Sequence, residues 1–392
     1  MIPITQTKLG LRGVTTFALG LLMFSAPLAA NAAVVWVKPG PFPDGMDTWY
    51  GNVYYTSSQH DGKLLVGGWG DEYDSLVRFN LSGLPLTATQ AIVWLYAYPT
   101  GGTPVNINWY LNTTQWHTGS VTWSTRPSAN PLFYTNAPPT IPGWYGVIFT
   151  TQYNAWRSGN TATPNYGLTM RPAANNNNFD AFYGSGYTGN TSLRPELDVY
   201  YNTSGTDSIP KWKWPLASPS YASRTVTQAF GAFPWAGGGT CPAGVQKYHN
   251  GTDYSTGGVG GATEYAPEDG IVKESITDSS GWGSNIVMEH TAPNGTKYTS
   301  VIWHITPNAD VIASNPGGFI PKGAPLGTVA NLVSPKVPHF HLGMRMAPYS
   351  YPTSGAGALP QSTCTEPNGL TYLGYPASFL NVENTSNVMI SN

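Results

Sequence analysis

The sequence predicts a mostly β protein in which an N-terminal β-sandwich precedes a small antiparallel β-sheet domain. Residues 34–201 contain short runs of β-branched and aromatic residues separated by turn residues, and residues 212–380 are β-rich in the same way. Helical periodicity is nearly absent, and only residues 151–157 suggest a short helix. With 392 residues the chain exceeds what one core usually serves, so two domains are expected.

The first 32 residues have the pattern of a secretory signal peptide. Lys8 and Arg12 are followed by an apolar run over residues 14–24 and by small residues around Ala32. No later stretch approaches the roughly 18–20 apolar residues that a membrane-spanning helix needs. We therefore expect a secreted, extracytoplasmic protein, in a bacterial periplasm, at the cell surface or outside the cell.

The charge balance argues against nucleic acid as a partner. The chain has 18 basic and 20 acidic residues, and loss of the signal peptide would change its net charge from −2 to 16 − 20 = −4. Charged residues make up only 10% of the chain, and no basic stripe is present. The abundance of Gly, Tyr and Trp is typical of extracellular β proteins, and exposed aromatic rings suit ligands rich in sugar.

Within the first domain, predicted at residues 33–201, strands are expected at 75–79 and 91–96. A polar tip is expected at 175–178, and the alternating residues 197–200 predict a closing strand. Many short strands joined by regular turns indicate a sandwich.

Residues 202–211, rich in Ser, Thr, Gly, Asp and Pro, are expected to be a linker. The second domain is predicted at 212–380, followed by a C-terminal tail at 381–392. Both cysteines, Cys241 and Cys364, fall in this half, and an oxidising compartment would favour a disulfide. Two unpaired thiols are the alternative, because the sequence does not establish proximity.

Two short motifs in the second domain combine residues that bind metals. His249 and Asp253 form His-x-x-x-Asp, and His339 and His341 form His-x-His. Residues i and i+2 of a strand point to the same face, so the second pair can address one site. His249 and Asp253 can share a face of an extended segment or meet through a bend at Gly251. Three such ligands with an open fourth position suit catalytic zinc, although the spacing alone also allows ordinary core or surface histidines.

Longer motifs give this half a resemblance to the lysostaphin-type (LytM-like) zinc peptidoglycan endopeptidases. The matching segments lie in order through the domain and include residues 249–253, 266–272, 281–287, 321–327 and 338–342, with His304 and Arg345. The resemblance implies a Zn²⁺ cofactor held by His249, Asp253 and His341, with His304 and His339 as the two catalytic histidines.

By the same resemblance, zinc lowers the pKa of a water molecule towards about 7, one of the two catalytic histidines accepts its proton, and the other stabilises the oxyanion. Trp303 and the pair Leu342–Gly343 depart from the family's usual residues and put the choice of substrate in doubt. His290 is expected to be structural, and His60 and His117 are expected at the surface.

The N-terminal domain resembles the DNRLRE (disaggregatase-related) domain, a β-sandwich like those of carbohydrate-binding modules. The matching segments are residues 76–85, 121–127, 165–168 and 194–199. Arg78 is expected to be buried and paired. Trp123 is interpreted as a core residue, with stacking on a sugar as the alternative.

These observations leave three functions open. The first is an endopeptidase that cuts stem peptides or cross-bridges of peptidoglycan and is delivered by a glycan-binding module. The second is a non-catalytic protein that binds the cell wall through a degenerate peptidase fold. The third places the function in the N-terminal sandwich, as an adhesin or polysaccharide-binding protein.

Overall fold

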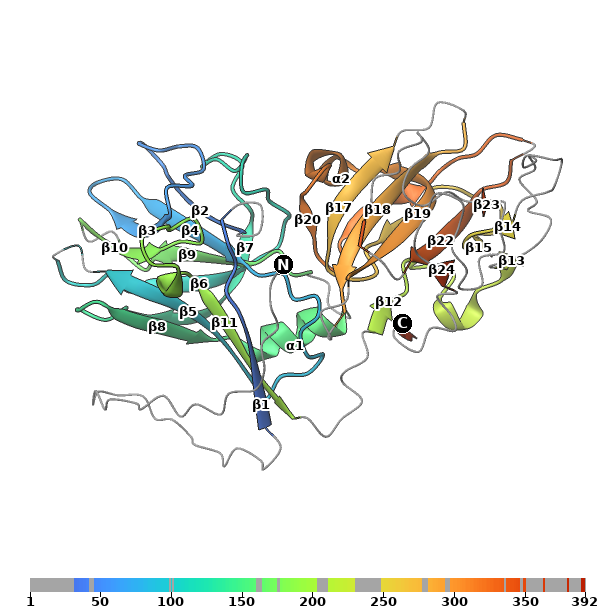
Figure 1. Ribbon diagram of the computed structural model, residues 1–392. Coiled ribbons are helices and arrows are strands. Elements are labelled where there is room, and N and C mark those ends of the chain that lie inside the picture. The colour runs from blue at the N-terminus through green and yellow to red at the C-terminus, as the bar shows by residue number, and fades with distance from the viewer. Residues whose placement is uncertain are drawn as a thin grey trace.

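The computed structural model describes most of the chain (Figure 1). The described residues are 32–41, 46–98, 100, 102–159, 164–174, 177–202, 211–229, 248–276, 281–292, 297–334, 336–345, 348–349, 362–363, 379–380 and 389–391. The predicted signal peptide (except Ala32), most of the predicted linker, Cys241 and Cys364 lie outside these residues. No helix among the described residues is long and apolar enough to cross a membrane.

The N-terminal half forms an 11-stranded sheet. Its strands are β1 (Ala32–Val37), β2 (Met46–Gly51), β3 (Lys63–Gly68), β4 (Tyr73–Arg78), β5 (Gln90–Tyr98), β6 (Ile107–Asn112), β7 (Ala129–Asn136), β8 (Gly143–Ile148), β9 (Leu168–Pro172), β10 (Asn178–Tyr183) and β11 (Glu196–Asn202). The hydrogen-bonded order is β1-β11-β5-β10-β3-β4-β9-β6-β7, with β2 beside β4 and β8 beside β5. A large buried core in this half takes side chains from strands along most of this order.

Side chains from most of these strands converge on that core. Along β5 every second residue from Ala91 to Ala97 is buried, which is the alternation expected of a strand with one face on the core. The predicted strands at 75–79, 91–96 and 197–200 are thereby confirmed as β4, β5 and β11. Of the polar tip expected at 175–178, residues 175–176 lie outside the described residues and Asn177 is exposed. The expectation is wrong at Asn178, which begins β10 and is buried with its side-chain amide donating to the Thr103 carbonyl.

Among the described residues the helices are few and short. They are α1 (Thr150–Ser158), α2 (Ala309–Ser314) and the 3₁₀ turns η1 (Thr191–Leu193) and η3 (Tyr221–Ser223). The helix predicted at 151–157 is confirmed as α1, which ends where Gly159 adopts a left-handed conformation. The mostly β prediction is confirmed.

The C-terminal half forms a second, 10-stranded antiparallel sheet. Its strands are β13 (Val226–Gln228), β15 (Thr252–Ser255), β16 (Thr263–Tyr265), β17 (Gly270–Ile276), β18 (Ser284–Thr291), β19 (Lys297–Pro307), β20 (Phe319–Ile320), β21 (Pro325–Val329), β22 (His339–Arg345) and β24 (Phe379–Leu380). The central order is β13-β15-β22-β19-β18-β17-β20. This half also has two separate two-stranded sheets. In one, β14 (Tyr248–His249) pairs with β23 (Ser362–Thr363), and in the other, β12 (Lys211–Lys213) pairs with β25 (Met389–Ser391).

The two halves share an interface with a buried ionic network. Arg157 of α1 donates to Glu268 at 2.8 Å, and both side chains are 1% exposed. Lys322 lies 3.7 Å from the other oxygen of Glu268 and donates to the Arg157 carbonyl. Asp269 accepts from the backbone amides of Leu81 and Lys322. Charges this deeply buried are tolerated only when they are paired, so the network ties α1 to the second sheet.

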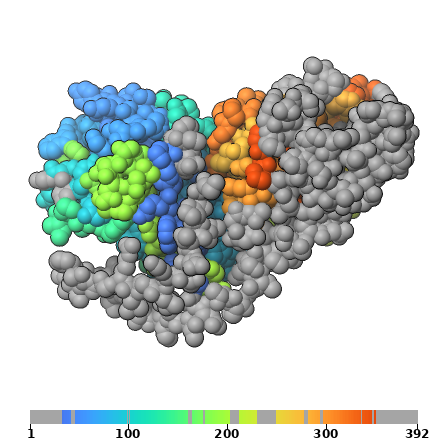
Figure 2. All heavy atoms as spheres, viewed as in Figure 1, coloured from blue at the N-terminus to red at the C-terminus, as the bar shows by residue number. Residues whose placement is uncertain are grey.

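An apolar cluster covers the same interface. Phe319 of β20 packs among residues of the first half that include Tyr50, Leu76 and Trp116. Arg78 is buried as expected, but its guanidinium lies over the rings of Trp116 and Phe319 and bonds to the Gln115 side chain instead of a carboxylate. Figure 2 shows teal atoms of the first half beside orange atoms of the second.

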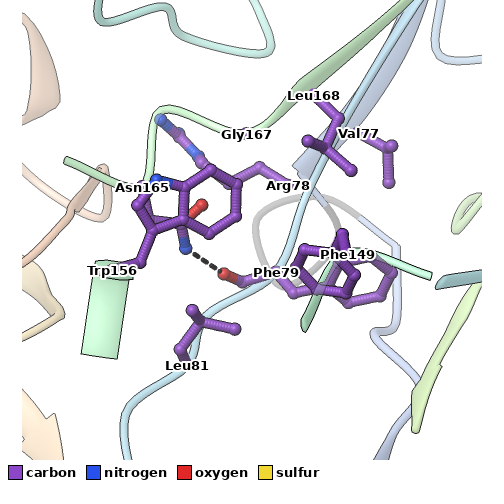
Figure 3. Close-up of a pocket in the computed structure, with 9 residues that line it drawn as sticks. All are labelled: Val77, Arg78, Phe79, Leu81, Phe149, Trp156, Asn165, Gly167 and Leu168. Atoms are coloured by element: carbon purple, nitrogen blue, oxygen red, sulfur yellow. Dashed lines mark hydrogen bonds between the residues drawn. The ribbon is translucent and has the colours of Figure 1, made fainter. Parts of the chain in front are cut away.

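A void near this interface is too small for a ligand. Its cavity volume is about 10 Å³, and it is lined by residues such as Phe79, Phe149 and Trp156 (Figure 3). Asn165 closes one side by donating to the Phe79 carbonyl at 2.8 Å. A space of this size holds at most about one water molecule, so the region is packed core.

Candidate metal centre

The candidate site lies on one face of the second sheet, where β15, β22 and β19 are neighbours. Asp253 of β15 stands directly opposite His341 of β22, which in turn stands opposite Trp303 of β19. Directly opposed residues of an antiparallel pair share a face, so these three side chains point the same way. His339 joins them because it lies two residues before His341 on the same strand.

His249 reaches the site from β14. Between His249 and Asp253 the chain leaves β14 and bends at Gly251 before β15 begins at Thr252. Of the two arrangements left open by the sequence, the structure has the bend. A Cβ atom on Gly251 would lie 2.4 Å from His341 Nε2, so this position must be glycine for the bend to pass over the imidazole.

Three potential ligand atoms converge at this point. His249 Nε2 lies 3.1 Å from His341 Nδ1 and 3.2 Å from Asp253 Oδ1. The distance between His341 Nδ1 and Asp253 Oδ1 is 2.8 Å. Ligand atoms about 2.0–2.2 Å from a tetrahedral zinc ion are separated by roughly 3.3–3.6 Å, so small outward shifts would fit such an ion. All three residues are buried, and they form a group able to hold a metal ion.

The hydrogen bonds of His249 prepare it for this role. Its Nδ1 bonds to the Ala229 carbonyl at 3.0 Å, and a carbonyl only accepts, so Nδ1 carries the proton. Nε2 therefore keeps its lone pair and points to the other two ligands. Such outer bonds fix the tautomer and orientation of metal-binding histidines.

The electrostatics also favour a cation. Burial would raise the pKa of Asp253, but the close approach of the His249 and His341 imidazoles outweighs it and holds this pKa below its ordinary value. Burial lowers the pKa of His341 to about 4, although the hydrogen bond and charge of Asp253 oppose the shift. At neutral pH the site thus offers an ionised carboxylate and a neutral imidazole, the forms that bind metals.

His304 comes to the site through a β-bulge. Ser284 of β18 pairs with Ile305 of β19, but the next residue, Asn285, pairs with Trp303, so His304 is the extra residue. It has a left-handed backbone with φ of 65°, which is uncommon for a residue other than glycine. Strict alternation would direct His304 away from Trp303 and the metal face. The bulge allows both side chains to face the site, and their rings lie 6.4 Å apart.

The neighbouring turn holds His304 in place. His304 Nδ1 donates to the Trp282 carbonyl at 2.7 Å. Gly283 follows with a positive φ, and a Cβ there would come within 3.1 Å of the His304 backbone. Burial, followed by the charge of His339, lowers the pKa of His304 to about 3, so its imidazole is neutral at neutral pH.

His304 and His339 lie together beside the three ligand atoms. Their ring centroids are 4.2 Å apart, and His339 Nε2 is 3.6 Å from Asp253 Oδ2. His339 Nδ1 bonds to the Val337 carbonyl at 2.7 Å and therefore carries the proton, as His304 Nδ1 does. In its neutral form each ring thus has an unprotonated Nε2. The structure brings together all five residues singled out from the sequence.

The other histidines lie elsewhere. His290 is buried between the Asp269 carbonyl and the Ser300 hydroxyl, as expected of a structural residue. His60 is exposed. The surface expectation is wrong for His117, which is partly buried at the interface and within 3.4 Å of the Ser314 hydroxyl.

Sequence reasoning missed the carbonyls of Ala229, Trp282 and Val337, which fix the imidazole tautomers. Of these three positions, only Trp282 could have been noticed in the sequence, because glycines on both sides of it indicate a turn.

The model of carbohydrate-binding module family 96 matches residues 46–182. The comparison with curated proteins gave no match.

Several solved peptidase structures are similar to the chain. A zinc-containing peptidase from Vibrio cholerae is 22% identical with a TM-score of 0.27, covering 37% of this chain and 40% of that one. The catalytic domain of the antimicrobial peptidase lysostaphin from Staphylococcus simulans is 17% identical with a TM-score of 0.24, covering 33% and 85%. A putative peptidase M23 from Pseudomonas aeruginosa is 13% identical with a TM-score of 0.22, covering 81% and 90%. Likeness at this level does not bear on activity.

Proposed function

We propose that the protein is a secreted zinc metalloendopeptidase that hydrolyses peptide bonds of peptidoglycan, in the stem peptide or the cross-bridge. The observation that carries this proposal is the convergence of His249 Nε2, Asp253 Oδ1 and His341 Nδ1, with two further imidazoles beside them. A structural zinc site is closed by four protein ligands, whereas three ligands with neighbouring general bases are typical of hydrolytic zinc sites.

His249, Asp253 and His341 would hold the ion, which supplies Lewis acidity that makes water a nucleophile near neutral pH. The imidazoles of His304 and His339 lie together beside these ligands. One accepts the proton of the attacking water, and the other, once protonated, donates to the oxyanion that forms on the scissile carbonyl. Two adjacent imidazoles suit this division of roles because only one of them needs to be charged at a time.

The N-terminal half would hold the enzyme on its polymer. Its match to a carbohydrate-binding module supports binding of a polysaccharide, and the glycan strands of the wall are the nearest candidate for a peptidase that acts there. Tethering raises the effective concentration of the site near its peptide bonds.

A second candidate is a non-catalytic protein that binds polysaccharide and keeps a degenerate peptidase fold. The family match favours it, because that match concerns carbohydrate binding alone. The five assembled side chains favour the enzyme, since a binding role does not require two imidazoles beside a metal site.

The test is the zinc content together with the release of new amines from purified peptidoglycan. We expect wild type to bind about one zinc and to release amines. His341→Ala should lose metal and activity together, whereas His339→Ala should keep most of the metal and lose turnover. The exposed His60→Ala is the matched control and should retain both. If wild type binds no zinc and cuts no wall type, the peptidase proposal is wrong.

A further inference from the structure

The surface around His339 is where a substrate would approach the candidate metal centre. The His339 side chain is 17% exposed and that of Asp253 is 8% exposed, whereas the three remaining imidazoles of the site are completely buried. The side chains that border His339 are therefore the ones that a peptide can contact before it reaches the site.

Two short segments border this surface, and each also orients one of the two adjacent imidazoles. The Trp282 carbonyl accepts a hydrogen bond from His304 Nδ1, and the Val337 carbonyl accepts one from His339 Nδ1, both at 2.7 Å. The Trp282 ring is partly exposed and lies 5.7 Å from the His304 ring. Both segments therefore lie at the edge of the site.

The two segments meet in a cation–π contact. Lys336 Nζ lies 4.5 Å from the centre of the Trp282 ring, a distance at which the ring attracts a cation. Gly281 has φ of 79°, and a Cβ atom there would lie 3.4 Å from the same Nζ, so the turn passes close to the ammonium group. The Lys336 amide also donates to the Val333 carbonyl at 3.1 Å, which closes a turn. These contacts give the ammonium a preferred position.

The contact with Trp282 brings a positive charge near the two imidazoles. An indole has no net charge, so it positions the Lys336 ammonium without neutralising it. Nζ lies 4.5 Å from the Trp282 ring, which itself lies 5.7 Å from the His304 ring. Together these distances are about the length of three extended residues. A carboxylate within roughly three residues of the scissile bond can therefore reach Nζ.

Exposed apolar side chains border the same surface. Val259 is 66% exposed and Val337 is 60% exposed. The Thr256 hydroxyl lies within hydrogen-bond distance of the Val259 carbonyl, at 2.9 Å, and of the Pro338 carbonyl, at 3.1 Å, so the two valine-bearing loops are joined beside His339. Apolar surface at this place favours a substrate with methyl groups, because a glycine chain has no side chain to bury there.

We propose that Lys336, positioned by Trp282, binds a carboxylate of the peptide substrate and makes the site selective for acidic stem peptides over glycine cross-bridges. Stem peptides carry carboxylates and alanine methyl groups, whereas a glycine bridge has neither along its length. The proposal rests on the proposed peptidase function and concerns which of its two substrates is cut. Lys336 determines specificity and takes no part in the chemical step.

The experiment compares three forms of purified peptidoglycan by the release of new amines. The first has direct cross-links, so that every peptide bond belongs to a stem. The second is the same material after carbodiimide and ammonia have converted its carboxylates to amides, and the third has glycine cross-bridges. A second assay follows tryptophan fluorescence of the chelator-treated full chain during titration with the stem tetrapeptide L-Ala–γ-D-Glu–L-Lys–D-Ala or its fully amidated form.

The variants are Lys336→Met, which removes the charge, and Lys336→Arg, which keeps it. The matched control is Lys297→Met, which removes one positive charge from a side chain that is 46% exposed. Lys297 begins β19 and lies seven residues before His304, roughly 23 Å away along the strand.

We expect wild type to cut the untreated, directly cross-linked wall about fivefold faster than its amidated form, as an exposed ion pair allows, and faster than the glycine-bridged wall. Lys336→Met should lose this preference by slowing on the untreated wall alone, and its affinity for the tetrapeptide should fall by a similar factor. Lys336→Arg and Lys297→Met should behave as wild type in both assays.

An equal preference for the untreated wall in wild type and Lys336→Met would overturn the role of Lys336, even if the variant were slower on both forms. Faster cutting of the glycine-bridged wall by wild type would overturn the substrate class and leave the peptidase function intact. If wild type cuts no wall, the proposed function fails. The titration then still tests the carboxylate site, which equal affinities of wild type and Lys336→Met for the tetrapeptide would refute.

Discussion

Arg157 offers a sharp test of how the two halves are joined. It lies on α1 in the first half and pairs with Glu268 of the second at 2.8 Å, with both side chains 1% exposed. Arg157→Met keeps an unbranched stem of similar reach and removes the charge. Glu268 is then left buried with the Asp269 amide and one cation, Lys322, whose Nζ lies 3.7 Å from its other oxygen.

The size of the effect follows from this arrangement. Breaking a buried ion pair by removal of one partner typically costs about 3–5 kcal/mol, because the remaining charge is uncompensated. Lys322 compensates part of it, so we expect the lower end, a loss of about 3 kcal/mol in the free energy of unfolding. Replacing Glu268 by Met as well should recover part of this loss, because no charge then requires a partner.

The assay is equilibrium urea denaturation followed by tryptophan fluorescence. The matched control is Lys63→Met, which breaks an ion pair with Asp61 at 3.6 Å whose side chains are 52% and 42% exposed. An exposed pair contributes at most about 1 kcal/mol, so this variant should be close to wild type. If Arg157→Met costs no more than Lys63→Met, the guanidinium is not buried between the halves and the described interface is wrong.

Three further predictions concern the second sheet. Burial lowers the pKa of His290 to about 4 from 6.5; the unfolded chain therefore takes up this proton first as pH falls, and stability should decline between pH 6.5 and 4 by up to about 3 kcal/mol. Urea titrations of His290→Gln should lack this part of the decline, and equal pH dependence in both proteins would contradict the burial. Gly251→Ala should weaken zinc binding at least about tenfold in chelator competition, because its Cβ would lie 2.4 Å from His341 Nε2; Gly119→Ala, with open space around it, should not. A chelator should lower the melting temperature of wild type and leave that of His341→Ala unchanged, since only a folded site that binds metal gains stability from it; equal shifts would point to a different site.

The sequence was informative where a pattern is local. Enrichment in β-branched and aromatic residues predicted β4 and β5, and alternation predicted β11. The short helix α1 was expected within one residue at each end. The His-x-His spacing placed His339 and His341 on one face because alternation in a strand leaves no other arrangement.

The remaining features depend on tertiary contacts that spacing does not encode. His304 reaches the site only through a left-handed bulge opposite Ser284 and Asn285, and strict alternation would have directed it away. Arg157 and Glu268 are 111 residues apart, and neither residue alone signals a buried pair. The misplacement of His117 has the same cause, because its burial comes from α2 of the other half.

The most direct test of the central claim is zinc K-edge X-ray absorption of the purified full chain, compared with that of His341→Ala. The account predicts about one zinc per chain, with two imidazoles and a carboxylate oxygen at about 2.0–2.2 Å and one exchangeable light ligand. His341→Ala should lose the metal or show a single imidazole. A full complement of zinc with an unchanged ligand shell in this variant would contradict the assignment of His249, Asp253 and His341 as the metal centre.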